Sequence, residues 1–224
     1  MSANYRSASI AGGVAGIVGW AVLVVAFMLA PTPPTLGASA SDITKYFGEH
    51  HTAVLVSSFL YATSAIPFAL WAGALAAKLR EAEGEAAWLY LTFLSGVVIT
   101  IAVNVCASFL SMALSGRGWA MGDASAQILA DIANYAYIFT GFSSAVFVAA
   151  ASVVIIRNGV IGPLLGQLGL IVAATQLISL ITAFFSDGIM VGGGPIFIAG
   201  FAILGLWLLA VSIGMIARAP TKAL

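Results

Sequence analysis

Long uncharged stretches dominate the pattern of hydrophobic and polar positions along the chain. Cutting the sequence at its charged residues leaves six long uncharged runs, at residues 7–41, 52–77, 86–116, 132–156, 158–186 and 188–217. Each run is longer than the about 20 residues that a helix needs to cross the ~30 Å hydrocarbon core of a bilayer. The pattern therefore predicts an all-α polytopic membrane bundle of six transmembrane helices, which forms a single domain over residues 1–224.

Composition narrows the class of protein further. Hydrophobic residues make up 62% of the chain and charged residues only 7%, whereas a soluble domain carries about 25% charged residues. This balance excludes a water-soluble globule and predicts the lipid bilayer as the surroundings. Because the 8 basic and 8 acidic residues cancel and form no basic stripe, nucleic acid is excluded as a partner.

Basic residues are distributed unevenly between the two sets of connections. One set, which includes both termini, carries Arg6, Lys78, Arg80, Arg157, Arg218 and Lys222. The other set carries only Lys45 and Arg117. Since basic residues accumulate on the cytoplasmic side, this distribution predicts a multi-pass protein of the plasma membrane with both termini in the cytoplasm. The charged stretch KLREAEGEAA in the first inner loop is interpreted as a solvated turn.

Three local signals refine the six spans. Residues 41–51 begin with helix-capping side chains and place apolar residues on one side, which predicts a short interfacial helix on the outer side between spans one and two. Pro67 lies in the middle of span two and predicts a kink there. The loop from Asp187 to Pro195 contains three consecutive glycines and is a candidate hinge.

Small residues follow one face of the first span. Gly12 and Gly16 are four residues apart, a spacing that lets a neighbouring helix approach closely. Close packing within this bundle is the favoured interpretation. The alternative is a contact to a second copy of the chain or to a larger membrane complex.

Several stretches of the sequence look familiar. The first loop ends in DITKYFGEHH, span two closes in FALWAGALAAKLREAEG, and span four closes in IIRNGVIGPLLGQLGLI. With the six-span layout, these stretches resemble a group of actinobacterial-type membrane proteins described as a domain of unknown function. The resemblance covers most of the chain and implies the six-span fold, but it implies no catalytic residue, cofactor or substrate.

Polar side chains within the spans are the candidates for function, because polar groups at membrane depth are costly and face the bundle interior. In spans four and five these residues recur at spacings of three and four, so that they form stripes in the outer half of the bundle. The candidate cavity residues are Tyr61, Asn104, Asp131, Asn134, Tyr137, Ser144, Gln176, Ser179 and Thr182. Interhelical packing is the favoured interpretation of these stripes, and a cavity that holds a ligand or solute is the alternative.

Signals for other chemistry are weak. His50 and His51 are adjacent, so on a helix they point about 100° apart and do not form an i, i+4 metal pair. No histidine lies within a span to ligate haem, and no nucleotide-binding or nucleophile motif is present, so no catalytic residue, metal site or cofactor is predicted. The favoured function is a small non-enzymatic binding or transport-type bundle, with an outward-facing polar cavity for a small molecule that spans two to five enclose. The alternative is a structural or accessory subunit of a larger membrane complex, and an enzyme comes third.

Overall fold

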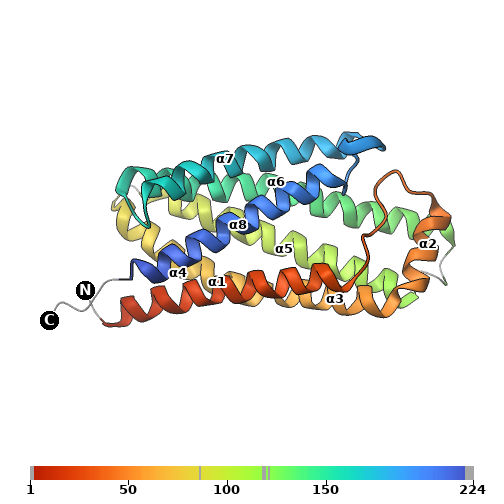
Figure 1. The fold of residues 1–224 in the computed structure, drawn as a ribbon, viewed down its shortest axis with the longest axis horizontal. Coiled ribbons are helices and arrows are strands. Elements are labelled where there is room, and N and C mark those ends of the chain that lie inside the picture. The colour runs from red at the N-terminus through yellow and green to blue at the C-terminus, as the bar shows by residue number, and fades with distance from the viewer. Residues whose placement is uncertain (1–2, 86, 118–119, 121, 220–224) are drawn as a thin grey trace.

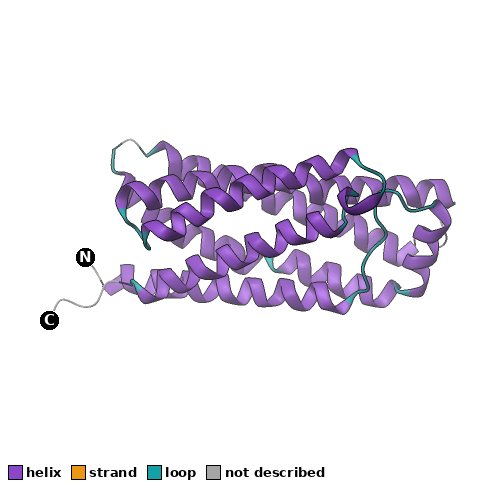
Figure 2. Ribbon diagram, turned by 45° about the horizontal axis from the view of Figure 1, so that its top comes forward, coloured by secondary structure: helices purple, strands orange, loops and turns teal. Residues whose placement is uncertain are grey.

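Each long apolar run predicted from the sequence contains a long helix in the computed structural model, which describes residues 3–85, 87–117, 120 and 122–219. Within the described residues no strand occurs (Figure 2). The helices are α1 (Ala3–Leu29), α2 (Ala40–Glu49), α3 (His51–Thr63), α4 (Ala65–Glu83), α5 (Trp88–Arg117), α6 (Asp123–Asn158), α7 (Pro163–Leu180) and α8 (Pro195–Ala217). Two short 3-10 helices, η2 (Ile181–Phe184) and η3 (Gly188–Met190), follow α7.

Six of these segments are long and apolar enough to cross a membrane, with α3 and α4 counted together as one span. They lie side by side in one bundle (Figure 1). The most buried span is α6, which packs against α5 and α7 along most of its length. The predicted all-α, six-span fold is therefore confirmed.

The predicted short helix between spans one and two is α2. Ser39 caps it by accepting a hydrogen bond from the backbone N–H of Asp42 at 3.2 Å. Its buried side chains, Ile43 and Phe47, pack against Leu114 at the end of α5 and against the start of α6. The helix lies across the end of the bundle opposite the start of α1 and the end of α8 (Figure 1). This end is called the α2 end below, and the opposite end the termini end.

Span two is interrupted at Ser64, one turn before Pro67. Pro67 has no N–H, so the carbonyl of Thr63 loses its normal helical partner. The hydroxyl of Thr63 donates to the carbonyl of Leu60 at 3.0 Å, and that of Ser64 donates to the carbonyl of Tyr61 at 2.6 Å. The helix is thus interrupted one turn before Pro67, which divides the span into α3 and α4, and the kink itself stays a prediction.

The glycines of the first span lie inside the bundle. A Cβ atom built on Gly12 would overlap Ala74 of α4, and one built on Gly16 would overlap Trp71 and Ser212. These contacts let α1 approach α4 and α8 closely. The Gly12 and Gly16 face is therefore used for packing within the chain, as the favoured interpretation expected.

Most of the charged stretch KLREAEGEAA lies in the last turns of α4, and only its end belongs to the connection to α5. The carboxylate of Glu83 accepts hydrogen bonds from the backbone N–H groups of Leu89 and Tyr90 at 2.9 and 3.0 Å. These donors lie in the first turn of α5 and have no helical partner of their own. A negative charge at a helix N-terminus is also favourable. Glu83 therefore caps α5, which corrects the interpretation of this stretch as a solvated turn.

The glycine-rich loop before α8 is packed against the segment that follows α1. The N–H of Leu36 donates to the carbonyl of Gly192 at 3.3 Å. A Cβ atom on Gly37 would overlap the carbonyl of Ser186, so the two segments touch closely. Both segments lie at the α2 end, where residues 30–34 and Gly193 line the second of the two cavities described below.

Candidate binding cavities

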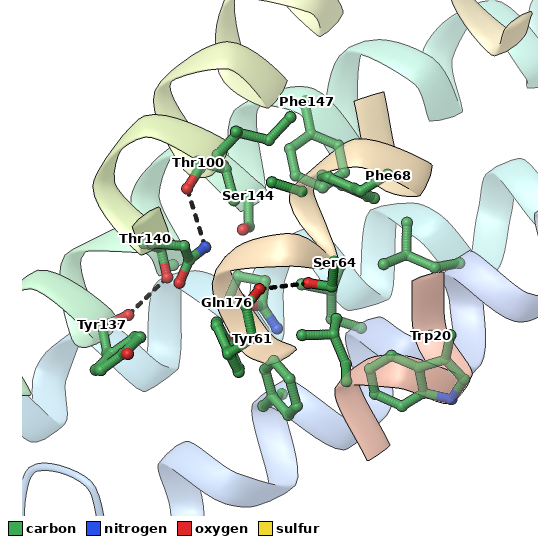
Figure 3. A pocket seen from close by; sticks show the side chains of 18 of the residues that line it. Trp20, Tyr61, Ser64, Phe68, Thr100, Tyr137, Thr140, Ser144, Phe147 and Gln176 are labelled. Atoms are coloured by element: carbon green, nitrogen blue, oxygen red, sulfur yellow. Dashed lines mark hydrogen bonds between the residues drawn. The ribbon is translucent and has the colours of Figure 1, made fainter. Parts of the chain in front are cut away.

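A cavity of about 80 Å³ lies in the middle of the bundle and is called the central cavity. All six spans contribute to its wall. Its lining residues are Trp20, Leu23, Tyr61, Ser64, Ala65, Phe68, Thr100, Ile101, Asn104, Val105, Tyr137, Thr140, Gly141, Ser144, Phe147, Gln176, Ser179, Phe197, Phe201, Leu204 and Leu208. Figure 3 shows Thr140, Ser144 and Gln176 gathered around one space.

A second cavity, of about 200 Å³, lies toward the α2 end and is called the α2-end cavity. The end of α1, residues 30–34, α2, α3, α6 and α8 form most of its wall, which also includes Ser111 of α5. Four aromatic residues line both cavities: Tyr61, Tyr137, Phe197 and Phe201. The two cavities are therefore adjacent, and these rings lie between them.

The rings between the two cavities contact one another. The centroids of Tyr61 and Tyr137 are 5.6 Å apart with the planes at 77°, which is an edge-to-face arrangement. Tyr61 also stacks on Phe201 at 6.4 Å with an interplanar angle of 26°. Such contacts are favourable beyond the burial of ring area. The space between the cavities is thus closed by a cluster of rings rather than by backbone.

Two amide side chains from different helices are among the polar groups that line the central cavity. Asn104 of α5 donates through Nδ2 to the carbonyl of Thr100 at 2.9 Å. Gln176 of α7 donates through Nε2 to the carbonyl of Gly200 at 2.8 Å, which ties α7 to α8. The Oδ1 atom of Asn104 is buried and has no partner among the described residues.

Most of the polar residues expected at the cavity are brought together there. Tyr61, Asn104, Tyr137, Ser144, Gln176 and Ser179 line the central cavity. Asn134 lines the α2-end cavity and donates through Nδ2 to the carbonyl of Pro34 at 3.3 Å. The described wall of each cavity contains no charged side chain.

Two expected residues lie elsewhere. Asp131 is half-buried on α6, lines neither cavity, and has a buried Oδ1 atom with no partner among the described residues. Thr182 is fully buried in η2, where its hydroxyl donates to the carbonyl of Ser179 at 2.6 Å. The carboxylate of Asp131 therefore contributes nothing to the walls of the cavities, and they are uncharged.

Spans one and six contribute apolar residues to the cavity walls, and a search for polar side chains in the sequence does not find them. Trp20 and Phe27 come from α1, and Phe197 and Phe201 come from α8. The proline-rich segment 30–34 also lines the α2-end cavity. An aromatic residue in a span is tolerated against lipid as well as against protein, so only the fold distinguishes these positions. The cavities consequently involve all six spans rather than spans two to five.

No group of three or more His, Cys, Asp or Glu side chains that could hold a metal ion occurs in the part of the chain that the structure describes. His50 packs on the ring of Tyr46 at 5.3 Å. By its six apolar spans, the chain belongs to the class of multi-pass integral membrane proteins. Compared with known proteins, it matches no family model, no curated protein and no solved structure.

Proposed function

We propose that the protein is a small non-enzymatic binding or transport-type membrane protein that holds a small molecule in the two adjacent cavities. The observation that carries this proposal is the shared aromatic wall, which lies between a cavity at the α2 end and one in the middle of the bundle. Binding sites for small molecules are mostly apolar and contain a few placed polar groups. Both cavities fit this description.

The volumes set the size of the ligand. An apolar cavity of roughly 150 Å³ in a soluble protein holds one benzene molecule. The α2-end cavity, at about 200 Å³, accommodates a molecule of that size or slightly larger. The central cavity, at about 80 Å³, takes a few water molecules or one end of a longer ligand.

The absence of charge sets the chemical character of the ligand. No described lining residue is Asp, Glu, Lys or Arg. A charged ligand at membrane depth would have no partner of opposite sign, and isolated charges are costly there. The proposal is therefore an uncharged ligand, which enters from the α2 end on the outer side of the plasma membrane.

The alternative function, a structural or accessory subunit, relied on the small-residue face of α1. Gly12 and Gly16 are covered by α4 and α8 of the same chain. That face is not free to dock against a larger complex. The cavities consequently provide the better-supported function.

Cysteine accessibility tests the proposal without knowledge of the ligand. In a Cys106→Ser background, Asn134→Cys and Ser144→Cys place thiols in the α2-end and central cavities. Both thiols are expected to react with methyl methanethiosulfonate, a small uncharged reagent. Ser152→Cys is the matched control, because Ser152 is fully buried on α6 and lines neither cavity. If Ser144→Cys reacts as slowly as Ser152→Cys, the central cavity is closed to small molecules and the proposal fails.

A further inference from the structure

Aromatic side chains form much of the wall of the α2-end cavity. Six of these residues retain accessible surface, because five are half-buried and Phe27 is 49% exposed. They come from five different helices, α1, α2, α3, α6 and α8. The six are Phe27, Tyr46, Tyr61, Tyr137, Phe197 and Phe201.

Four of the six rings form a continuous series. Phe27 stacks on Phe201 at 6.5 Å with an interplanar angle of 25°, and Phe201 stacks on Tyr61 at 6.4 Å and 26°. Tyr61 in turn meets Tyr137 edge-to-face at 5.6 Å. Stacked and edge-to-face pairs are the two arrangements that the quadrupole of an aromatic ring favours. The wall therefore already contains both geometries in which a further ring is stable.

Phe197 differs from the other five rings. It lines both cavities and is half-buried. Its ring contacts no other ring among the described residues, whereas each of the other five has at least one ring contact. Phe197 is therefore the ring of this wall that is left to pair with a ligand.

Lipid surroundings make aromatic contacts the deciding interaction. A small apolar molecule that is dissolved in the bilayer has already left water, and lipid tails are as apolar as an aliphatic side chain. Burial of apolar area in the cavity consequently adds little. Lipid tails have no π-system, so an aromatic molecule gains ring contacts only in the cavity. A saturated molecule gains them in neither place.

From these rings, and resting on the proposed binding function, we infer the chemical class of the ligand. The α2-end cavity selects a small uncharged aromatic molecule over a saturated molecule of similar size. Its volume of about 200 Å³ accommodates one six-membered ring with a small substituent. Phe197 provides the main ring contact to this molecule.

A matched pair of probes tests the inference. Fluorobenzene and fluorocyclohexane are both six-membered rings with one fluorine atom, and only the first is aromatic. The full chain in lipid nanodiscs is titrated with each probe and binding is followed by ¹⁹F NMR, with empty nanodiscs as the reference for partition into lipid. Relative to that partition, fluorobenzene is expected to bind about threefold to tenfold more tightly, the effect of one favourable aromatic pair.

Two variants separate ring contact from fit, since a saturated ring is also thicker than a flat one. Phe197→Leu keeps an apolar side chain and removes the ring, so the preference for fluorobenzene is expected to fall below about twofold. Ile198→Ala is the matched control, because Ile198 is the next residue of α8, is half-buried and lines the same cavity. This variant widens the cavity and keeps every ring, so it should keep the wild-type preference. Thermal unfolding of both variants verifies that they are folded.

The outcomes separate the inference from the proposed function. Equal or tighter binding of fluorocyclohexane to the wild-type chain would overturn the inference and leave the proposed function intact. Loss of the preference in Ile198→Ala would show that flat shape makes the selection, which would also overturn the inference. An unchanged preference in Phe197→Leu would overturn the assignment to Phe197. Binding of neither probe above the empty nanodiscs would overturn both the inference and the proposed function. The wild-type and Ile198→Ala comparisons remain decisive even if Phe197→Leu does not fold.

Discussion

A single phenol oxygen connects α2 to the segment that leaves α1. The Oη atom of Tyr46 donates to the carbonyl of Pro31 at 2.7 Å, and the ring packs edge-on against Phe47 and His50. Burial raises the pKa of Tyr46 to about 12 from its ordinary value of 10.0. The neutral phenol is thus the form that the folded chain stabilises.

Tyr46→Phe removes this hydrogen bond and keeps the ring. At pH 8 it is expected to lower the free energy of unfolding by about 1 kcal/mol, as for a typical hydrogen bond. Because the folded-state pKa is raised, this stabilisation is present below pH 10 and is lost as the pH rises through 12. Thermal unfolding of both chains in detergent between pH 8 and pH 12 measures the difference. A difference that does not shrink over this range would show that the phenol proton has no part in stability.

Whether a cavity-lining residue can be recognised from the sequence depends on how unfavourable its side chain would be in contact with lipid. Asn104 and Gln176 were predicted to face inward, since an exposed amide would be unfavourable in the bilayer. Phe201 could not be recognised, because phenylalanine is tolerated on either side of a span. Phe139 and Phe142 illustrate this, with exposed fractions of 57% and 60% on α6. Only the packed fold distinguishes the ring between the cavities from rings that face outward.

At the level of helices, close contact between α1 and its neighbours depends on glycine. Gly12 lies against Ala74 of α4 and against Met215 of α8, and a Cβ atom there has no room. Gly73 of α4 offers a natural comparison, because a Cβ atom there would meet nothing within 4 Å. The same substitution at the two positions therefore separates steric cost from helix propensity.

Gly12→Ala is expected to lower the free energy of unfolding by about 1–3 kcal/mol, the usual cost of overpacking a well-packed contact. Gly73→Ala should be neutral or stabilising by up to about 1 kcal/mol, since alanine favours the helix over glycine. Thermal unfolding in the same detergent compares the two variants with the wild-type chain. Equal stability of both variants would contradict the close contact between α1 and α4.

The sequence predicts the existence of these elements better than their partners. Pro67 implies a break in span two because its missing N–H follows from the residue alone. The position of the break at Ser64 also depends on hydroxyls that bond to nearby carbonyls. The spacing of Gly12 and Gly16 predicts a close helix contact but cannot name α4 and α8 as the neighbours. Those partners follow from the packing of distant segments.

Across the whole molecule, basic residues separate between the two ends of the bundle. Arg6, Arg80, Arg157 and Arg218 lie at or near helix ends at the termini end. Lys45 in α2 and Arg117 at the end of α5 lie at the other end. Lys222 falls outside the described residues. Because positive charge favours the cytoplasmic side, the termini end is proposed to face the cytoplasm.

Cysteine labelling tests this orientation. Cys106 is exposed and must first be replaced by serine, so that the background carries no thiol. Ser125→Cys at the α2 end and Glu85→Cys at the termini end place single thiols at exposed positions. Glu85 is chosen over Gly84, whose φ of +69° would strain a cysteine. A membrane-impermeant maleimide added to intact cells is expected to label Ser125→Cys but to label Glu85→Cys only after the cells are opened. Labelling of Glu85→Cys in intact cells, with Ser125→Cys protected, would reverse the orientation and place the opening of the α2-end cavity on the cytoplasmic side.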